Sequence, residues 1–318
     1  MASIRPSRHE SRLPGSNRVI DRAGTARKGC TISLALAVLG STGEAQSSTS
    51  QLPATQISAR FAGFAGASTA MMGHAGSVFV NPAGLPAVRV ASLEGTYSRL
   101  ADDGEYFMGA AAARMGNLSL GGGMRYIRFE DGAPESRNLE SVIALATHVR
   151  GVAVGIAANY FSVRDGDGVM TRTLTGDAAL TVAVFDIAAL GLSVQNIGRA
   201  ALDGPGVELP STVHLGFSLN LIDTYSNGRL LATVEQVWGD DQHRGLGGGL
   251  RVGLEGGAVF YGVGLVARVG VGPRTPSSPF SRGTWGGSLV FGRSAIDYAY
   301  LTRKAGGAQH LFGWRLTL

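Results

Sequence analysis

Few stretches of this 318-residue chain have the residue types and spacing of a catalytic or ligand-binding motif, and in each the neighbouring sequence does not fit that motif. "GVGLVA" (Gly262 to Ala267) has the spacing of a dinucleotide-binding turn, which needs a strand before it and a helix after it. Both flanks instead continue a strand-like alternation, which predicts strand glycines. "DGDG" (Asp165 to Gly168) lacks the third acidic ligand and the distal Glu of a calcium loop. In "NLSLG", Asn117 stands where a nucleophile elbow needs Gly.

Histidine and cysteine form no recognisable site either. The chain has one cysteine, Cys30, so it offers no disulfide and no cluster of thiolate ligands. The histidines beyond the first 45 residues are scattered, with no pair four residues apart: His74, His148, His214, His243 and His310. The sequence therefore predicts no enzyme, no metal site and no cofactor.

Residues 1–45 have the order of a secretory signal peptide. A basic region ends at Lys28, the apolar run "CTISLALAVLG" follows, and small residues predict cleavage after Ala45. The apolar run is shorter than the ~20 residues of a membrane-spanning helix. Most of the net charge of +5 lies in this leader. Because the remainder is nearly balanced, no nucleic-acid partner is expected.

From residue 87 to residue 318 the chain alternates apolar and polar residues in runs of about ten. In "TVHLGFSLNL", Leu215 and its apolar neighbours point to one side, and Ser218 and its polar neighbours point to the other. About fourteen such strands fit, each long enough for a tilted membrane strand of ~9–11 residues. No run of 18 or more apolar residues exists outside the leader, which excludes a helical membrane protein.

The connections between these strands alternate in length, mostly long and then mostly short. The short ones read "MG", "RG", "DIA", "GGA" (Gly256 to Ala258) and "GR", with the longer "IDTYSNG" as an exception. One end of tight turns and one of longer loops is typical of outer-membrane barrels. A soluble β-sandwich would need bulky apolar inner faces, whereas the second face here is small and polar. The sequence predicts an all-β, about 14-stranded antiparallel transmembrane barrel in the bacterial outer membrane, surrounded by its lipid.

Several polar residues share the inward parity of these strands. They are expected to face the lumen, where they form either a polar pathway or an ion-pair network that fills the barrel. The network is favoured because charges inside a barrel need partners. Inward-facing glycines are expected to leave room inside. The candidates are Arg125, Asn159, Glu235, Arg251, Asp297 and Arg315.

The small-residue stretch "ARFAGFAGASTAMMGHAGSVFVNPAGLP" precedes the first strand. It resembles the N-terminal signature of fatty-acid-transporter-like (FadL-like) barrels, and within them the PorV/PorQ family. "LGLSVQNIG", "LPSTVHLGFSLNL", "IDYAYL" and "HLFGWRLTL" agree with that family in the same order. One departure is Met72-Gly73-His74, which stands where the family usually has acidic residues.

The resemblance implies that residues 46–86 fold into the lumen as a hatch and that residues 87–318 close around them. Asn81, Pro82, Ala83 and Gly84 would form the turn from lumen to wall at the periplasmic rim. Two functions follow: protein export, in which the barrel binds secretion machinery or exported cargo proteins, and, as the alternative, passive transport of hydrophobic small molecules. The family resemblance favours the first.

Overall fold

The computed structural model describes residues 48–49, 57–100, 104–129, 137–164, 168–185, 187–204, 206–223, 228–239, 248–273, 280–303 and 307–318. The expected signal peptide (residues 1–45) and its cleavage after Ala45 lie outside the described residues. Residues from Ala45 to Leu318 belong to one compact unit, which contains both the barrel and the segment that precedes it.

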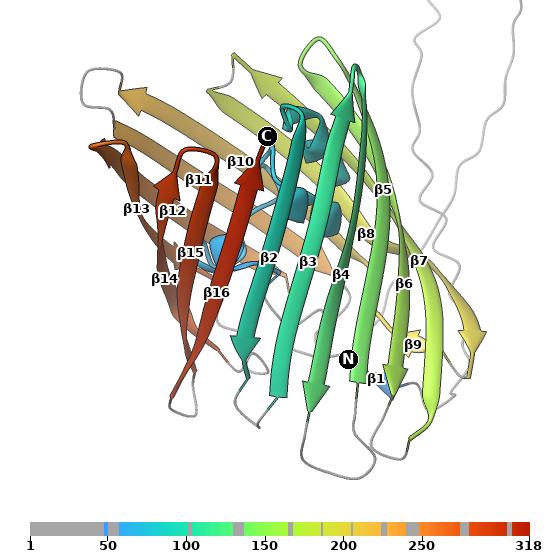
Figure 1. Cartoon of the computed structure of the whole chain (residues 1–318). Coiled ribbons are helices and arrows are strands. Elements are labelled where there is room, and N and C mark those ends of the chain that lie inside the picture. Colours follow the sequence, from blue (N-terminus) through green and yellow to red (C-terminus); the bar gives the residue numbers. More distant parts are fainter. Residues whose placement is uncertain are drawn as a thin grey trace, which may run out of the picture. The chain divides into compact units, whose positions relative to one another are not determined.

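Fourteen antiparallel strands form a closed barrel (Figure 1). Sequence neighbours pair throughout, and β16 pairs with β2 to close the ring. The predicted fold class is therefore confirmed. The strands are β2 Ala91–Arg99, β3 Gly104–Met115, β4 Leu118–Phe129, β5 Arg137–Val149, β6 Val152–Arg164, β7 Met170–Val184, β8 Ala188–Asp203, β10 Thr212–Asp223, β11 Gly228–Gly239, β12 Gly249–Phe260, β13 Val263–Val271, β14 Phe280–Phe291, β15 Ser294–Arg303 and β16 Ala308–Thr317.

Two further strands lie apart from the barrel sheet. β9 (Val207–Glu208) lies in the long connection between β8 and β10, and it pairs in parallel with β1 (Ser48–Thr49). Residues just after the expected cleavage point thus lie at the long-loop end of the barrel.

The alternation of side chains decides what faces lipid and what faces the lumen. In β10, Leu215 is 37% exposed and Ser218 is 7% exposed, as the alternation predicts. β6 shows the same pattern, with Ile156 outward and Ala157 buried. An apolar outer band lets the strands face hydrocarbon while the closed ladder pairs every strand edge.

One predicted turn is wrong. Gly256 to Ala258 do not connect two strands; they lie inside β12, and the turn falls at Tyr261–Gly262. Both turn residues have positive φ, 50° at Tyr261 and 81° at Gly262. This left-handed pair matches the twist of a tight hairpin. Val259, which follows the wrongly predicted turn, also belongs to β12.

The lumen is occupied by the chain before β2. A barrel of eight strands can be filled by wall side chains, but a larger one encloses space. Here residues 57–90, called the hatch below, coil inside the ring (blue to cyan in Figure 1). The hatch contains helix α1 (Ala59–Ala62) and the 3-10 helices η2 (Ala75–Phe79) and η3 (Pro82–Ala87). None of the described helices has the length and apolar character needed to cross a membrane.

Candidate functional site

The hatch is built from very short helices joined by tight bends. Ser58 caps α1 by accepting a hydrogen bond from the Phe61 N–H at 3.3 Å, and Gly63 ends it. Ala65 and Gly66 follow with φ of 54° and 81°, which reverses the chain. Small residues tolerate this density of bends and leave little side-chain bulk, so the segment fits inside a closed ring.

Glycines of the wall let the hatch backbone approach closely. A Cβ atom added at any of a set of lumen-facing glycines would come closer than 3.0 Å to a hatch atom. At Gly191 and Gly270 the clashing atoms belong to the hatch backbone, at Thr69 and Phe64, and cannot rotate away. The expectation that inward-facing glycines leave room inside is confirmed. The set is Gly121, Gly123, Gly155, Gly191, Gly216, Gly253 and Gly270.

Asn81 organises the second half of the hatch. Its Oδ1 accepts from the Ala83 N–H at 3.0 Å, which caps η3, with Pro82 at the first helical position. Its Nδ2 donates to Thr69 O at 2.6 Å and to Thr181 Oγ1 of β7 at 2.9 Å. One amide therefore joins two parts of the hatch to the wall.

The motif forms the cap and the first residues of η3, and its place at the periplasmic rim stays a prediction. Asn81 to Gly84 are buried in the lumen, and the chain passes from the hatch into the barrel sheet near Val90, whose N–H donates to Leu318 O. Gly84 does not have a positive φ; a Cβ there would press on Met71 O and Ser77 at 3.3 Å. Gly84 is thus needed for close packing and not for a left-handed turn.

One side of the hatch packs on an apolar wall, formed by β3–β6 and called the apolar side below. β3 turns Tyr106, Met108, Ala110 and Ala112 inward, all buried. Hatch side chains complete the same cluster, among them Phe61, Phe64, Met71, Val78, Phe79, Val80 and Leu85. One buried ion pair interrupts this side: Arg125 of β4 lies opposite Met108 in the strand register and pairs with Glu140 of β5. The Arg125 guanidinium stands 5.2 Å from the Phe79 ring centroid, a cation–π distance.

The opposite wall, β11–β16, is called the charged side. Glu235 of β11 accepts from the N–H groups of Ser68 and Thr69 at 2.7 and 2.8 Å. The same carboxylate lies 2.8 Å from His214 Nδ1 and 3.5 Å from Arg251. These contacts hold the middle of the hatch by charge-assisted hydrogen bonds, which are stronger than neutral ones.

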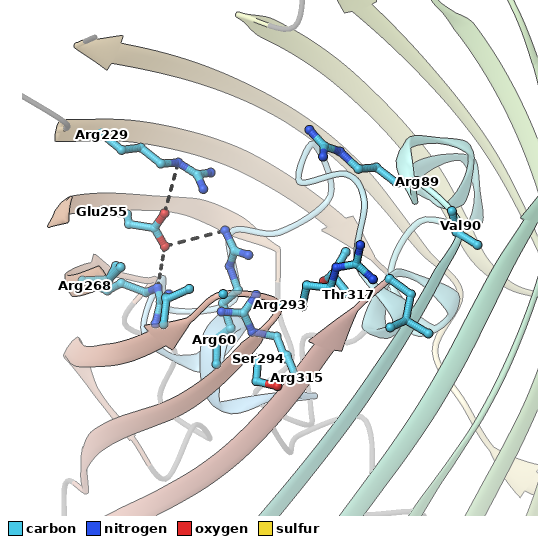
Figure 2. A pocket seen from close by; sticks show the side chains of 15 residues that line it. Arg60, Arg89, Val90, Arg229, Glu255, Arg268, Arg293, Ser294, Arg315 and Thr317 are labelled. Atoms are coloured by element: carbon cyan, nitrogen blue, oxygen red, sulfur yellow. Dashed lines mark hydrogen bonds and ion pairs between the residues drawn. The ribbon is translucent and has the colours of Figure 1, made fainter. Parts of the chain in front are cut away.

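A chain of ion pairs continues around the charged side (Figure 2). Glu255 of β12 faces three arginines, at 2.6 Å from Arg268, 3.5 Å from Arg229 and 3.6 Å from Arg60 of the hatch. Arg268 also reaches Asp297 at 3.2 Å. Among the described residues, the buried carboxylate of Glu255 is the only acidic group within 4.0 Å of the Arg60 guanidinium.

Arg60 also binds His74, at 2.8 Å between Nη1 and Nε2. Burial lowers the pKa of His74 well below its usual value, and the charge of Arg60 lowers it further. The imidazole is therefore neutral and accepts from the guanidinium.

The predicted lumen residues all face inward, but they form separate groups. Asp297 is joined to Arg315 at 2.5 Å, and Glu235 to Arg251 at 3.5 Å. Arg125 pairs instead with Glu140 at 2.8 Å, and Asn159 donates to Asp177 Oδ2 at 2.8 Å. Inward parity could have identified the partners that the prediction omits: Glu94, Glu140, Asp177, His214, Glu255 and Arg268.

The contacts described above fasten the hatch to both sides of the barrel wall. In the part of the chain that the structure describes, no three His, Cys, Asp or Glu side chains are grouped so that they could hold a metal ion.

Comparisons with known proteins show the fold. No protein-family model matches the chain, and no curated protein sequence does. The toluene transporter TodX of Pseudomonas putida is similar in structure, with a TM-score of 0.57 at 13% sequence identity over 82% of this chain and 99% of that one. The toluene transporter TbuX of Ralstonia pickettii gives 0.54 at 12% identity, over 83% and 98%. A FadL homologue of Pseudomonas aeruginosa gives 0.51 at 12%, over 82% and 98%. The chain therefore has the fold of FadL-type barrels and resides in the outer membrane.

Proposed function

We propose that this protein is a passive transporter of hydrophobic small molecules across the outer membrane, with the hatch as its closure. The observation that carries the proposal is the apolar side of the hatch interface. Porin lumens are polar, whereas every buried side chain from Tyr106 to Ala112 of β3 is apolar apart from the tyrosine hydroxyl. A hydrophobic solute that passes between β3 and the hatch would exchange one apolar contact for another.

The comparisons support the same proposal. Two of the similar structures are described as toluene transporters. Protein export, the function first expected, rests on the PorV/PorQ resemblance alone, because no family model matches the chain and the similar structures cited are transporters or a FadL homologue.

Uptake measurements test this function. Cells that carry the protein in their outer membrane should take up labelled toluene faster than cells without it, while uptake of a disaccharide stays unchanged. Met108→Gln places an amide on the apolar side and should slow toluene uptake several-fold.

Met115→Gln is the matched control. It makes the same change in the same strand, but Met115 is 55% exposed on the outer face, so uptake should not change. Equal toluene uptake with and without the protein would contradict the proposal, as would equal effects of the two variants.

A further inference from the structure

A cavity of about 450 Å³ lies at the short-turn end of the barrel, between the hatch and the charged side. Figure 2 shows the side chains that line it. Its floor is formed by buried residues, Arg60, Glu255 and Arg268, and its outer edge by exposed ones, which include Arg293 and Leu318. Outer-membrane barrels keep their short turns in the periplasm, so the cavity opens toward the periplasm.

The cavity wall carries far more positive than negative charge. Of the acidic side chains that the structure describes, only Glu255 lines it; Asp297 stands behind Arg268 and Arg315, and Glu94 lies opposite Arg315 in the strand register. Six arginines line the cavity: Arg60, Arg89, Arg229, Arg268, Arg293 and Arg315. Even after each of these three carboxylates is counted against one arginine, a positive surplus is left.

Several of these guanidinium groups have N–H donors that no acceptor of the described residues satisfies. Arg60 is only 3% exposed, yet its Nε has no hydrogen-bond partner among the described residues. Burial lowers the pKa of Arg60 to about 9, and the charges of Arg315, Arg268 and Arg229 add to this effect, although Glu255 opposes it. Arg89 and Arg293, both exposed, make no side-chain ion pair within the described ranges. A buried donor without an acceptor is costly, so an added anion would stabilise this arrangement.

We propose that this cavity is a binding site for a phosphate-class oxyanion, presented either by a soluble compound or by a lipid head group of the inner leaflet. Arginine forks match the oxygens of phosphate in bidentate geometry. A phosphomonoester carries about −1.5 to −2 charges at neutral pH, which fits the surplus better than the single charge of a carboxylate.

The size of the cavity favours a ligand larger than one inorganic ion. Pockets for small organic ligands measure roughly 300–1,000 Å³, and this one is about 450 Å³. An anion there would bridge Arg60 of the hatch to Arg229 and Arg315 of the wall. The site therefore pins the hatch from the periplasmic end, independently of what the barrel transports.

Calorimetric titration with pyrophosphate tests the site on the full protein in phosphatidylcholine nanodiscs at constant ionic strength. The intact protein should bind pyrophosphate in a saturable manner. The double variant Arg89→Gln/Arg293→Gln removes exposed guanidinium groups without leaving a carboxylate unpaired. It should weaken binding about tenfold or more, the loss expected for charged hydrogen bonds.

Arg150→Gln is the control, because Arg150 is exposed at another short turn and does not line the cavity. It should leave the affinity unchanged. Absence of saturable binding, or an equal loss in the control and the double variant, would overturn the proposal. Nanodiscs that contain phosphatidic acid distinguish the sources: competition with pyrophosphate identifies a lipid head group, and undiminished pyrophosphate binding identifies a soluble anion.

Discussion

The hatch meets two unlike walls within one barrel. On the apolar side it is held by shape, through residues such as Val78 and Leu85 packed on β3–β6. On the charged side it is held by carboxylates, with Glu235 on its backbone and Glu255 on Arg60. Ion pairs weaken with changes in pH and salt, whereas apolar contacts depend on them much less. The hatch is therefore attached on one side by contacts that respond to pH and salt and on the other by contacts that do not.

The energies of the two attachments also differ in kind. Apolar burial contributes roughly 25 cal/mol per Å² of area removed from water. A buried ion pair gains little net stability, because the desolvation of both charges offsets their attraction, but loss of one partner is costly. We therefore expect the charged side to set where the hatch sits and the apolar side to supply most of the net stability.

The largest effect is expected from Glu255→Gln. This change leaves the arginines around Glu255 without their carboxylate, and removal of one partner from a buried pair costs about 3–5 kcal/mol. The free energy of unfolding in lipid vesicles measures it. Glu105→Gln, at a partly exposed glutamate near the long-loop end, should cost under about 0.5 kcal/mol. Similar losses would mean that Glu255 does not hold the hatch.

Next is Gly270→Val, which drives a side chain into the hatch backbone at Phe64 and Ala65. Overpacking costs about 1–3 kcal/mol, and backbone neighbours that cannot rotate place this variant near 3. Displacement of the hatch should raise the conductance in planar bilayers. Gly256→Val is the control, since a Cβ there meets nothing within 4 Å. A conductance as low as that of the control would show that the wall does not need glycine there.

On the apolar side, Val78→Ala removes two methyl groups from the buried cluster. At ~0.8 kcal/mol for each methylene-sized group, the cost should be about 2 kcal/mol. Unlike the Glu255→Gln effect, it should be the same at low and high salt. Val154→Ala, on the lipid-facing side of β6, is the control and should cost less. A salt-dependent loss at Val78 would break the contrast between the two sides.

The smallest effect concerns pH. The folded-state pKa of His74 lies below its unfolded value, so the unfolded chain binds more protons as pH falls through the usual histidine range. Stability is therefore full above about pH 6.5 and declines below it, because His74 gains a proton only when the hatch releases it from its buried place beside Arg60. Conductance should rise between pH 7 and pH 5 in the intact protein and less so in His74→Gln. An equal rise in both would assign the pH effect elsewhere.

The strands could be predicted because alternation is a local property, and Leu215 and Ser218 show their facing within one short run. The turn near Gly256 was predicted wrongly because glycine occurs both in turns and within the strands of the barrel wall, as in β12. The real turn uses Tyr261, whose side chain gives no such signal.

The contact partners of the buried charged side chains could not be predicted from the sequence, and the reason is a different one. Arg268 lies opposite Glu255 because of the register between β12 and β13, which depends on the stagger of the closed barrel. The contact of Glu235 with Ser68 joins residues 167 positions apart. Alternation gives the face of each side chain, but not its height in the lumen or its neighbour.

Planar-bilayer conductance of a protein that lacks residues 57–80 tests the central claim most directly, namely that the hatch closes the barrel. The ladder of fourteen strands does not include these residues, so circular dichroism should still report a folded barrel. We expect a large, persistent conductance in the deletion variant and little in the intact protein. A folded deletion variant that conducts no more than the intact protein would contradict it.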